Sequence, residues 1–161
     1  DVAVSLNNLG LVFEKIGNYD KAIEVHEKAL EIRKQSFGPN DVHFASSLYN
    51  LGDVYYNTGN YEKAIDVHEK ALEIRKHSLG PNHVYVADSL NNLGNVYYNT
   101  GNYDKALKFY EKALEIRKQS LGRNHVDVAV SLNNLGLVFY KIGNYDKAIE
   151  LHEKALEIRK Q

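Results

Sequence analysis

Leu6-Asn7-Asn8-Leu9-Gly10 is the stretch that decides the fold, because its pattern returns every 42 residues along the chain. The second copy reads Leu48-Tyr49-Asn50-Leu51-Gly52, and the original five residues return at 90–94 and at 132–136. A period of this length is typical of stacked supersecondary units that bury their apolar faces against one another. We therefore expect function to lie on a surface spread over several repeats.

The repeats are close to identical in sequence. Of the 35 residues from 1 to 35, 33 recur unchanged from 127 to 161, and only Glu14 and Val25 are exchanged, for Tyr140 and Leu151. The period divides the chain into repeats 1–42, 43–84, 85–126 and 127–161, which together form one repeat domain over residues 1–161. Position 1 is not methionine and lies inside a repeat, so we expect this chain to be a fragment of a longer array.

Each repeat has the pattern of two amphipathic helices. In the first repeat, apolar residues fall at three- and four-residue spacing from Ala3 to Ile16, which is the stripe of a helix. Gly17-Asn18 then interrupts the pattern, since Gly suits the end of a helix and Asn suits the N-cap of the next one. A second helix follows from Tyr19 and is stopped by Gly38-Pro39-Asn40. Because no segment alternates with period two, the sequence predicts an all-α chain.

Two details of packing follow from these helices. Gly10 lies inside a helix, where it costs about 1 kcal/mol relative to Ala, so its recurrence predicts a close helix crossing. Ala22 and Ala29 are the matching small residues on the second helix. The charged residues of that helix, Arg33 among them, are expected on an outer, solvated face.

Composition excludes several classes of function. With 43% apolar and 25% charged residues, the chain is expected to fold. Its net charge of −1 lacks the excess of basic residues that is typical of nucleic-acid-binding domains. No apolar run approaches the length of a membrane span. The chain has no cysteine, sequon or signal peptide, which favours an intracellular, cytoplasmic setting.

The repeat resembles the tetratricopeptide repeat. The residues that carry the resemblance are Leu6, Leu9-Gly10 and Phe13 on the first helix, then Gly17-x-Tyr19-x2-Ala22 and Ala29. The 42-residue period and the Gly-Pro-Asn-His loops are similar to the longer version found in kinesin light chains. This resemblance implies a right-handed α-solenoid of four helix-turn-helix repeats, in which the first helices line a concave groove.

Differences between the four copies mark a candidate binding surface. Changes of chemistry fall on one stripe of the first helix, at the positions of residues 4, 7, 11 and 14. The resemblance implies that this stripe faces the groove. It also implies that the second asparagine of the Asn-Asn pair, Asn8 and its copies, forms a column that holds a peptide backbone. An amide side chain can donate and accept toward a peptide unit. The candidate groove residues are Asn8, Asn50, Asn92, Asn134, Asn7, Tyr49, Asn91, Asn133, Asp53, Asn95, Tyr56, Tyr98, Tyr140, Asn57 and Asn99.

Two alternatives to peptide binding remain for the asparagine column. Its recurrence can be a result of duplication alone, because duplication copies every residue. The asparagines can equally serve to bridge adjacent helices. The basic residues with which related arrays clamp a free carboxylate are missing from the corresponding positions, so an extended internal peptide is the expected ligand.

Nothing in the sequence predicts catalysis, a metal site or a cofactor. His26, His68 and His152 recur once per repeat, and one imidazole per repeat is too few for zinc, so these residues are expected to pack. No phosphate-binding loop or nucleophile motif is present.

The sequence therefore predicts a protein-binding scaffold that is not an enzyme and binds neither nucleic acid nor membrane. One alternative is a sensor array of a larger signalling NTPase. Another is a mainly structural or engineered repeat that stacks end to end. Neither end has a distinct polar capping helix, so head-to-tail self-association is also expected.

Overall fold

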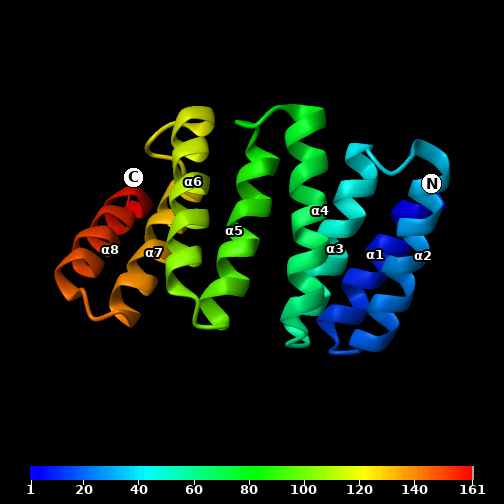
Figure 1. The fold of residues 1–161 in the computed structure, drawn as a ribbon, viewed down its shortest axis with the longest axis horizontal. Coiled ribbons are helices and arrows are strands. Elements are labelled where there is room, and N and C mark those ends of the chain that lie inside the picture. Colours follow the sequence, from blue (N-terminus) through cyan, green and yellow to red (C-terminus); the bar gives the residue numbers. More distant parts are fainter. Residues whose placement is uncertain (161) are drawn as a thin grey trace. The chain divides into compact units, whose positions relative to one another are not determined.

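The computed structural model describes residues 1–160, and this part of the chain forms eight α-helices (Figure 1). The helices are α1 (Val2–Lys15), α2 (Tyr19–Phe37), α3 (Val42–Asn57), α4 (Tyr61–Leu79), α5 (Val84–Asn99), α6 (Tyr103–Leu121), α7 (Val126–Lys141) and α8 (Tyr145–Lys160).

The helices pair into the four expected hairpins, which belong to two compact units. In the unit Asp1–Pro81, α1 packs on α2, α2 on α3 and α3 on α4, and α1 also contacts α3. In the unit that begins at Asn82, α5 packs on α6, α6 on α7 and α7 on α8. Helices adjacent in sequence are thus adjacent in space within each unit, which confirms the predicted all-α repeat fold.

The turn inside each hairpin is built as the sequence predicts. Gly17 has φ of 77°, a left-handed conformation that ends α1 without the steric cost of a side chain. Asn18 then caps α2 by accepting a hydrogen bond from the backbone N–H of Lys21 at 3.3 Å. The same pair of residues recurs at each later hairpin turn, so all four pairs of helices are joined alike.

The loop between repeats also caps the helix that follows it. Asp41 caps α3 and accepts from the backbone N–H of His43 at 2.7 Å. In the later loops a histidine, His83 or His125, caps α5 or α7 through its ring nitrogen.

The core between helices is rich in alanine and branched aliphatic residues. Ala22 and Ala29 of α2 are completely buried, as their copies in α4 and α6 are, which confirms them as close-packing positions. Arg33 corrects the expectation of a wholly charged outer face, because it is buried and its Nη1 donates to the backbone oxygen of His43 at 2.8 Å. This arginine ties α2 to the start of α3.

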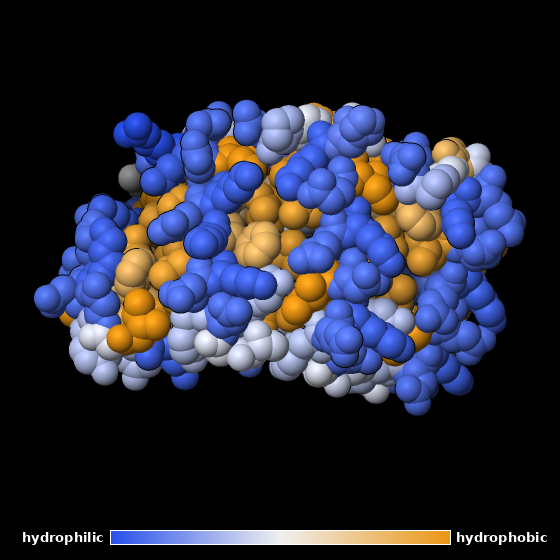
Figure 2. Space-filling model, in the orientation of Figure 1, coloured by the Kyte–Doolittle hydropathy of each residue, from blue (hydrophilic) through white to orange (hydrophobic). Residues whose placement is uncertain are grey.

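The face seen in Figure 2 is mainly hydrophilic, with charged and polar side chains over most of it. Apolar side chains show between them over several of the helices. None of the helices described is both long and apolar enough to cross a bilayer.

Candidate functional site

The first-helix glycine of every repeat lies against a ring from the second helix. A methyl group placed on Gly10 would come within 2.4 Å of the His26 ring, and one on Gly94 within 2.5 Å of Tyr110. Gly52 and Gly136 face His68 and His152 in the same way. The glycine predicted to allow a close crossing therefore makes room for a side chain, and the predicted packing role of the three histidines is confirmed.

Polar side chains from the first helix hold this ring in three of the four repeats. His26 is hydrogen-bonded to Asn7 Oδ1 and to Glu14 Oε1, both at 3.1 Å. In the third repeat the hydroxyl of Tyr110 donates to Asn95 Oδ1 at 2.6 Å. The fourth repeat uses Asn133, whose Oδ1 lies 2.9 Å from His152 Nδ1.

This arrangement divides the candidate stripe in two. Asn7 and Asn91 are buried, and Tyr49 stacks edge-on against the His68 ring at 5.7 Å between centroids. Asn95 and Asn133 also contact the ring of their repeat, whereas Asn91 contacts α7, and Asn7 donates in addition to Ser47 Oγ of α3 at 3.4 Å. These side chains are engaged within the protein, and we call them the floor of the stripe.

The second asparagine of the pair lies nearer to solvent than the first in the first and third repeats. Asn8 is exposed and Asn50 half-exposed, and among residues 1–160 neither side chain makes a hydrogen bond. Asn92 is also half-exposed. Asn134 donates to Asn91 Oδ1 at 2.9 Å and so bridges α7 to α5. Bridging of helices is the alternative role that the sequence left open for this column.

The candidate tyrosines are braced by a second tyrosine. Tyr56 lies 5.9 Å from Tyr61, which is the first residue of α4. The same tilted pair recurs at 5.8 Å for Tyr98 and at 5.7 Å for Tyr140. Tyr56 and Tyr98 are half-exposed and Tyr140 is exposed, so each side chain remains partly accessible beside its pair. The neighbouring Asn57 and Asn99 are exposed at the ends of their helices.

The stripe of the first unit carries two carboxylates. Burial and, to a smaller extent, the charge of Glu14 raise the pKa of Asp53 to about 7, although Arg75 acts in the opposite direction. Burial, followed by the charge of Arg75, lowers the pKa of His68 to about 4. Since His68 Nε2 lies only 3.6 Å from Asp53 Oδ1, a neutral imidazole faces a carboxyl group that titrates near neutrality. The only signal for this pair in the sequence is the change from leucine, at position 11, to aspartate at position 53.

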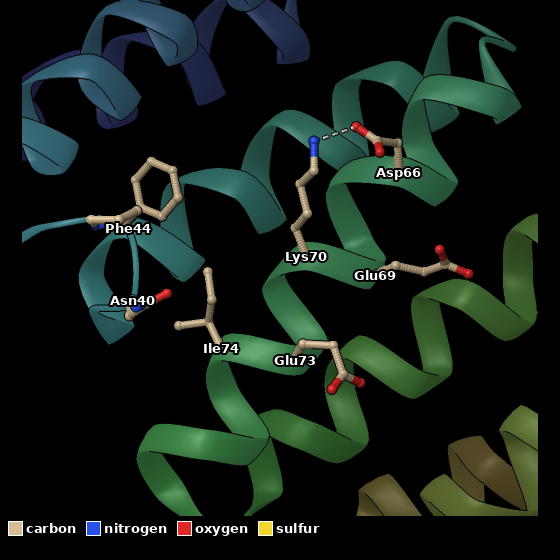
Figure 3. A pocket seen from close by; sticks show the side chains of 8 residues that line it. Asn40, Phe44, Asp66, Glu69, Lys70, Glu73 and Ile74 are labelled. Atoms are coloured by element: carbon tan, nitrogen blue, oxygen red, sulfur yellow. Dashed lines mark hydrogen bonds and ion pairs between the residues drawn. The ribbon is translucent and has the colours of Figure 1, made fainter.

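A pocket that the sequence did not predict lies on α3, α4 and the loop before α3. Phe44 and Ile74 border an open space of about 460 Å³. Figure 3 shows these two side chains, together with the ion pair of Lys70 and Asp66. The other lining residues are Pro39, Asn40, Glu69 and Glu73. The available signal was Phe44, because the other repeats have valine at its position. An apolar floor with a mainly acidic rim suits an apolar side chain next to a cation.

Two further hollows are consequences of the repeat. The turn residues 16–20 with Thr58 enclose about 510 Å³, and the equivalent residues 100–104 with Ile142 enclose about 440 Å³. Within residues 1–160 no group of three or more histidine or acidic side chains is placed to hold a metal ion.

Comparison with known proteins agrees with this geometry. Three overlapping stretches, residues 1–77, 43–119 and 85–161, match the family model described as Tetratricopeptide repeat. No curated protein sequence shows significant similarity to the chain.

Solved structures show the same arrangement of helices. BtubC (BKLC) from P. vanneervenii is 29% identical, with a TM-score of 0.89 over 98% of this chain, and the chain spans 63% of that protein. A Podosopora anserina protein, described as a kinesin light chain with nearly identical TPR-like repeats, is 21% identical. Its TM-score is 0.84 over 96% of this chain and 74% of that one.

MamA is 27% identical, with a TM-score of 0.71 over 98% of this chain and 78% of that one. The family match covers every repeat, and the hairpins have the Leu-Gly and Gly-x-Tyr positions that define it. The chain therefore belongs to the tetratricopeptide repeat family.

Proposed function

We propose that this chain is a non-catalytic scaffold that binds an extended segment of a partner protein along the first helices. Tetratricopeptide repeats generally serve as protein-interaction scaffolds, and the resemblance to kinesin light chains supports a protein partner here. The observation that carries the proposal is the pair Asn8 and Asn50. These amides lie at matched positions of α1 and α3, reach solvent, and make no hydrogen bond among the described residues.

The chemistry of the surrounding stripe supports a peptide backbone as the ligand. An amide side chain both donates and accepts, so it can satisfy one peptide unit of an extended segment. Tyr56, Tyr98 and Tyr140 would add contact area at low conformational cost, since each ring is already held by its neighbour. The floor residues, such as Asn7 and Asn133, contribute by fixing the ring beneath the stripe.

The experiment is a titration with a library of extended peptides, followed by the variant Asn8→Ala/Asn50→Ala. Each lost hydrogen bond is worth about 1 kcal/mol, so the double variant should bind selected peptides at least about tenfold more weakly. Asn124→Ala is the matched control, because Asn124 is an exposed asparagine in the loop before α7. Unchanged affinity in the double variant, or capture of free C-terminal carboxylates alone, would exclude this mode of binding.

A further inference from the structure

The two carboxylates of the stripe lie on neighbouring first helices of one unit. Glu14 belongs to α1 and Asp53 to α3, and these two helices contact each other. The charge of Glu14 is one of the causes that raise the pKa of Asp53, so the two groups are close enough to repel each other. Asp53 also lies one helical turn from Asn50, one of the amides on which the proposed function rests.

This combination of acidic residues occurs once in the chain. The other repeats have neutral side chains at both positions, namely Leu11, Asn95 and Leu137 at the position of Asp53, and Tyr56, Tyr98 and Tyr140 at the position of Glu14. At these two positions of the stripe, negative charge is therefore confined to the joint between the first two repeats. A ligand that binds along the stripe meets this charge at one defined place.

The cationic groups near Asp53 do not hold it in its ionised form. Arg75 of α4 is buried, and its guanidinium carbon lies 4.5 Å from the centre of the Tyr49 ring. Its charge acts to lower the pKa of Asp53, yet this pKa stays at about 7. His26 of α2 contacts the other carboxylate, Glu14, at 3.1 Å. The unit therefore supplies too little positive charge at Asp53 to keep this carboxyl group fully ionised at neutral pH.

A buried imidazole points at the same carboxyl group. His68 of α4 is completely buried, and among residues 1–160 neither of its ring nitrogens has a hydrogen-bond partner. In the first repeat Asn7 bonds to Nδ1 of the equivalent ring, but Tyr49 replaces that asparagine here. His68 Nε2 lies 3.6 Å from Asp53 Oδ1, just beyond hydrogen-bond distance. Because a buried polar group without a partner costs free energy, a small movement of Asp53 that gives His68 an acceptor is favourable.

We propose that the carboxylates of Glu14 and Asp53 bind an arginine side chain of the partner segment. This inference rests on the groove function proposed above and names the chemistry of its ligand. A guanidinium group has five N–H donors in one plane and a permanent charge, so it can serve both carboxylates and compensate their repulsion. The Asp53 side chain is 39% exposed, so it is accessible to such a group from solvent.

Binding of the arginine moves a proton. The positive charge favours the ionised form of Asp53, so this carboxyl group releases its proton to solvent and then accepts a hydrogen bond from His68 Nε2. The ring of His68 is packed against Gly52, which holds it in place for this contact. Since the pKa of Asp53 without ligand is about 7, the affinity for arginine should rise up to about tenfold from pH 6 to pH 8 and then level off.

The experiment compares two peptides that differ in one charge. The probe is acetyl-Gly-Ser-Arg-Ser-Gly-amide, and its reference is the same peptide with citrulline, which has nearly the shape of arginine but is neutral. NMR titration of the isotope-labelled chain at pH 8 should show tighter binding of the arginine peptide, with shifts centred on Glu14 and Asp53. The carboxyl carbon-13 signal of Asp53, followed against pH, should show a lower pKa with the arginine peptide and an unchanged pKa with the citrulline peptide.

Two variants test the carboxylate itself. Asp53→Asn should bind the arginine peptide about fivefold more weakly at pH 8, and this binding should no longer change between pH 6 and pH 8. Asparagine is the residue of the third repeat at this position, so the variant should fold. Asp66→Asn is the matched control, because Asp66 is an exposed carboxylate of the same unit that pairs with Lys70 on α4. It should bind the arginine peptide like the unmodified chain.

The outcomes separate this site from the groove function. Equal binding of the two peptides, or an Asp53 signal that does not respond to about 10 mM arginine peptide, would overturn the arginine site. Equal losses in Asp53→Asn and Asp66→Asn would do the same, since they would reflect net charge alone. The groove function is judged separately, because an uncharged peptide whose binding depends on Asn8 and Asn50 would support it even then.

Discussion

At Gly52 the lack of a side chain makes room for the His68 ring, and the equivalent pair occurs in every repeat. The sequence indicated that something approaches this glycine closely. It did not show that the neighbour is His68, because this histidine lies 16 residues further along the chain and only the folded hairpin brings the two together. At the scale of single residues, the glycine and the ring are one packing unit.

Replacement of Gly52 by Ala should destabilise the protein, although alanine is the better helix former. The added methyl group would lie 2.5 Å from the ring of His68, which is completely buried and has no space to move. We expect a loss of about 1–3 kcal/mol in the free energy of unfolding, measured by chemical denaturation. In a His68→Ala background the same change should cost much less. An equal cost in both backgrounds would contradict the contact.

Asp53 and His68 make opposite contributions to stability as pH changes. The pKa of His68 is lowered to about 4, so its contribution is complete above pH 6.5 and is lost as pH falls toward 4. The pKa of Asp53 is raised to about 7, so its contribution is complete below about pH 4 and is lost as pH rises through 7. Between pH 4 and 6.5 the two contributions offset each other.

The variant Asp53→Asn should expose the histidine contribution alone. Its free energy of unfolding should fall more steeply than that of the unmodified protein as pH is lowered from 6.5 to 4, by urea denaturation at each pH. Asparagine is the residue of the third repeat at this position, so the variant is compatible with the fold. Glu14→Tyr, which copies the other three repeats, should lower the pKa of Asp53 in an NMR titration. Parallel pH profiles for Asp53→Asn and the unmodified protein would contradict the assignment.

At the scale of helices, a buried arginine near the end of α2, Arg33, and one near the end of α6, Arg117, each tie one repeat to the next. Arg33 makes one hydrogen bond, to the backbone oxygen of His43. Arg117 bonds to the Ser131 hydroxyl and forms an ion pair with Asp88 at 2.9 Å. Asp88 is the only acidic residue at its position in the four repeats. Arg117 therefore makes more polar contacts with neighbouring helices than Arg33 does.

Replacement of Arg117 by Met should cost more stability than replacement of Arg33 by Met. Hydrogen bonds to charged groups contribute about 2 kcal/mol, and Arg117→Met leaves both Ser131 and Asp88 without this partner. We expect about 1 kcal/mol or more between the two variants in the free energy of unfolding. Equal losses would show that Asp88 contributes nothing to the tie.

At the scale of the whole molecule, periodicity predicted more than any single residue did. Helix positions, hairpin turns such as Gly17-Asn18 and the buried alanines followed from spacing alone. The burial of Arg33 did not, because a charged residue on an amphipathic helix is usually solvated. The division of the asparagine pairs into a buried floor and an outer column depends on ring contacts such as His26 with Asn7, which sequence spacing cannot specify.

The two terminal helices should be the least protected part of the chain. Since α1 and α8 leave apolar faces exposed, they should open before α3 and α7, whose matching faces are covered. Native-state hydrogen exchange in dilute solution should show faster exchange at mid-helix amides of α1 and α8. Uniform protection across the helices would contradict this gradient.

The near-identity of the first and last repeats has a consequence for inheritance. Recombination between their coding segments would add or remove whole repeats without disturbing the reading frame. The new junction would join α2-type and α1-type helices that already fit each other, with the same glycine, ring and arginine in place. A gene of this kind can change in length in one step and still encode a protein that folds.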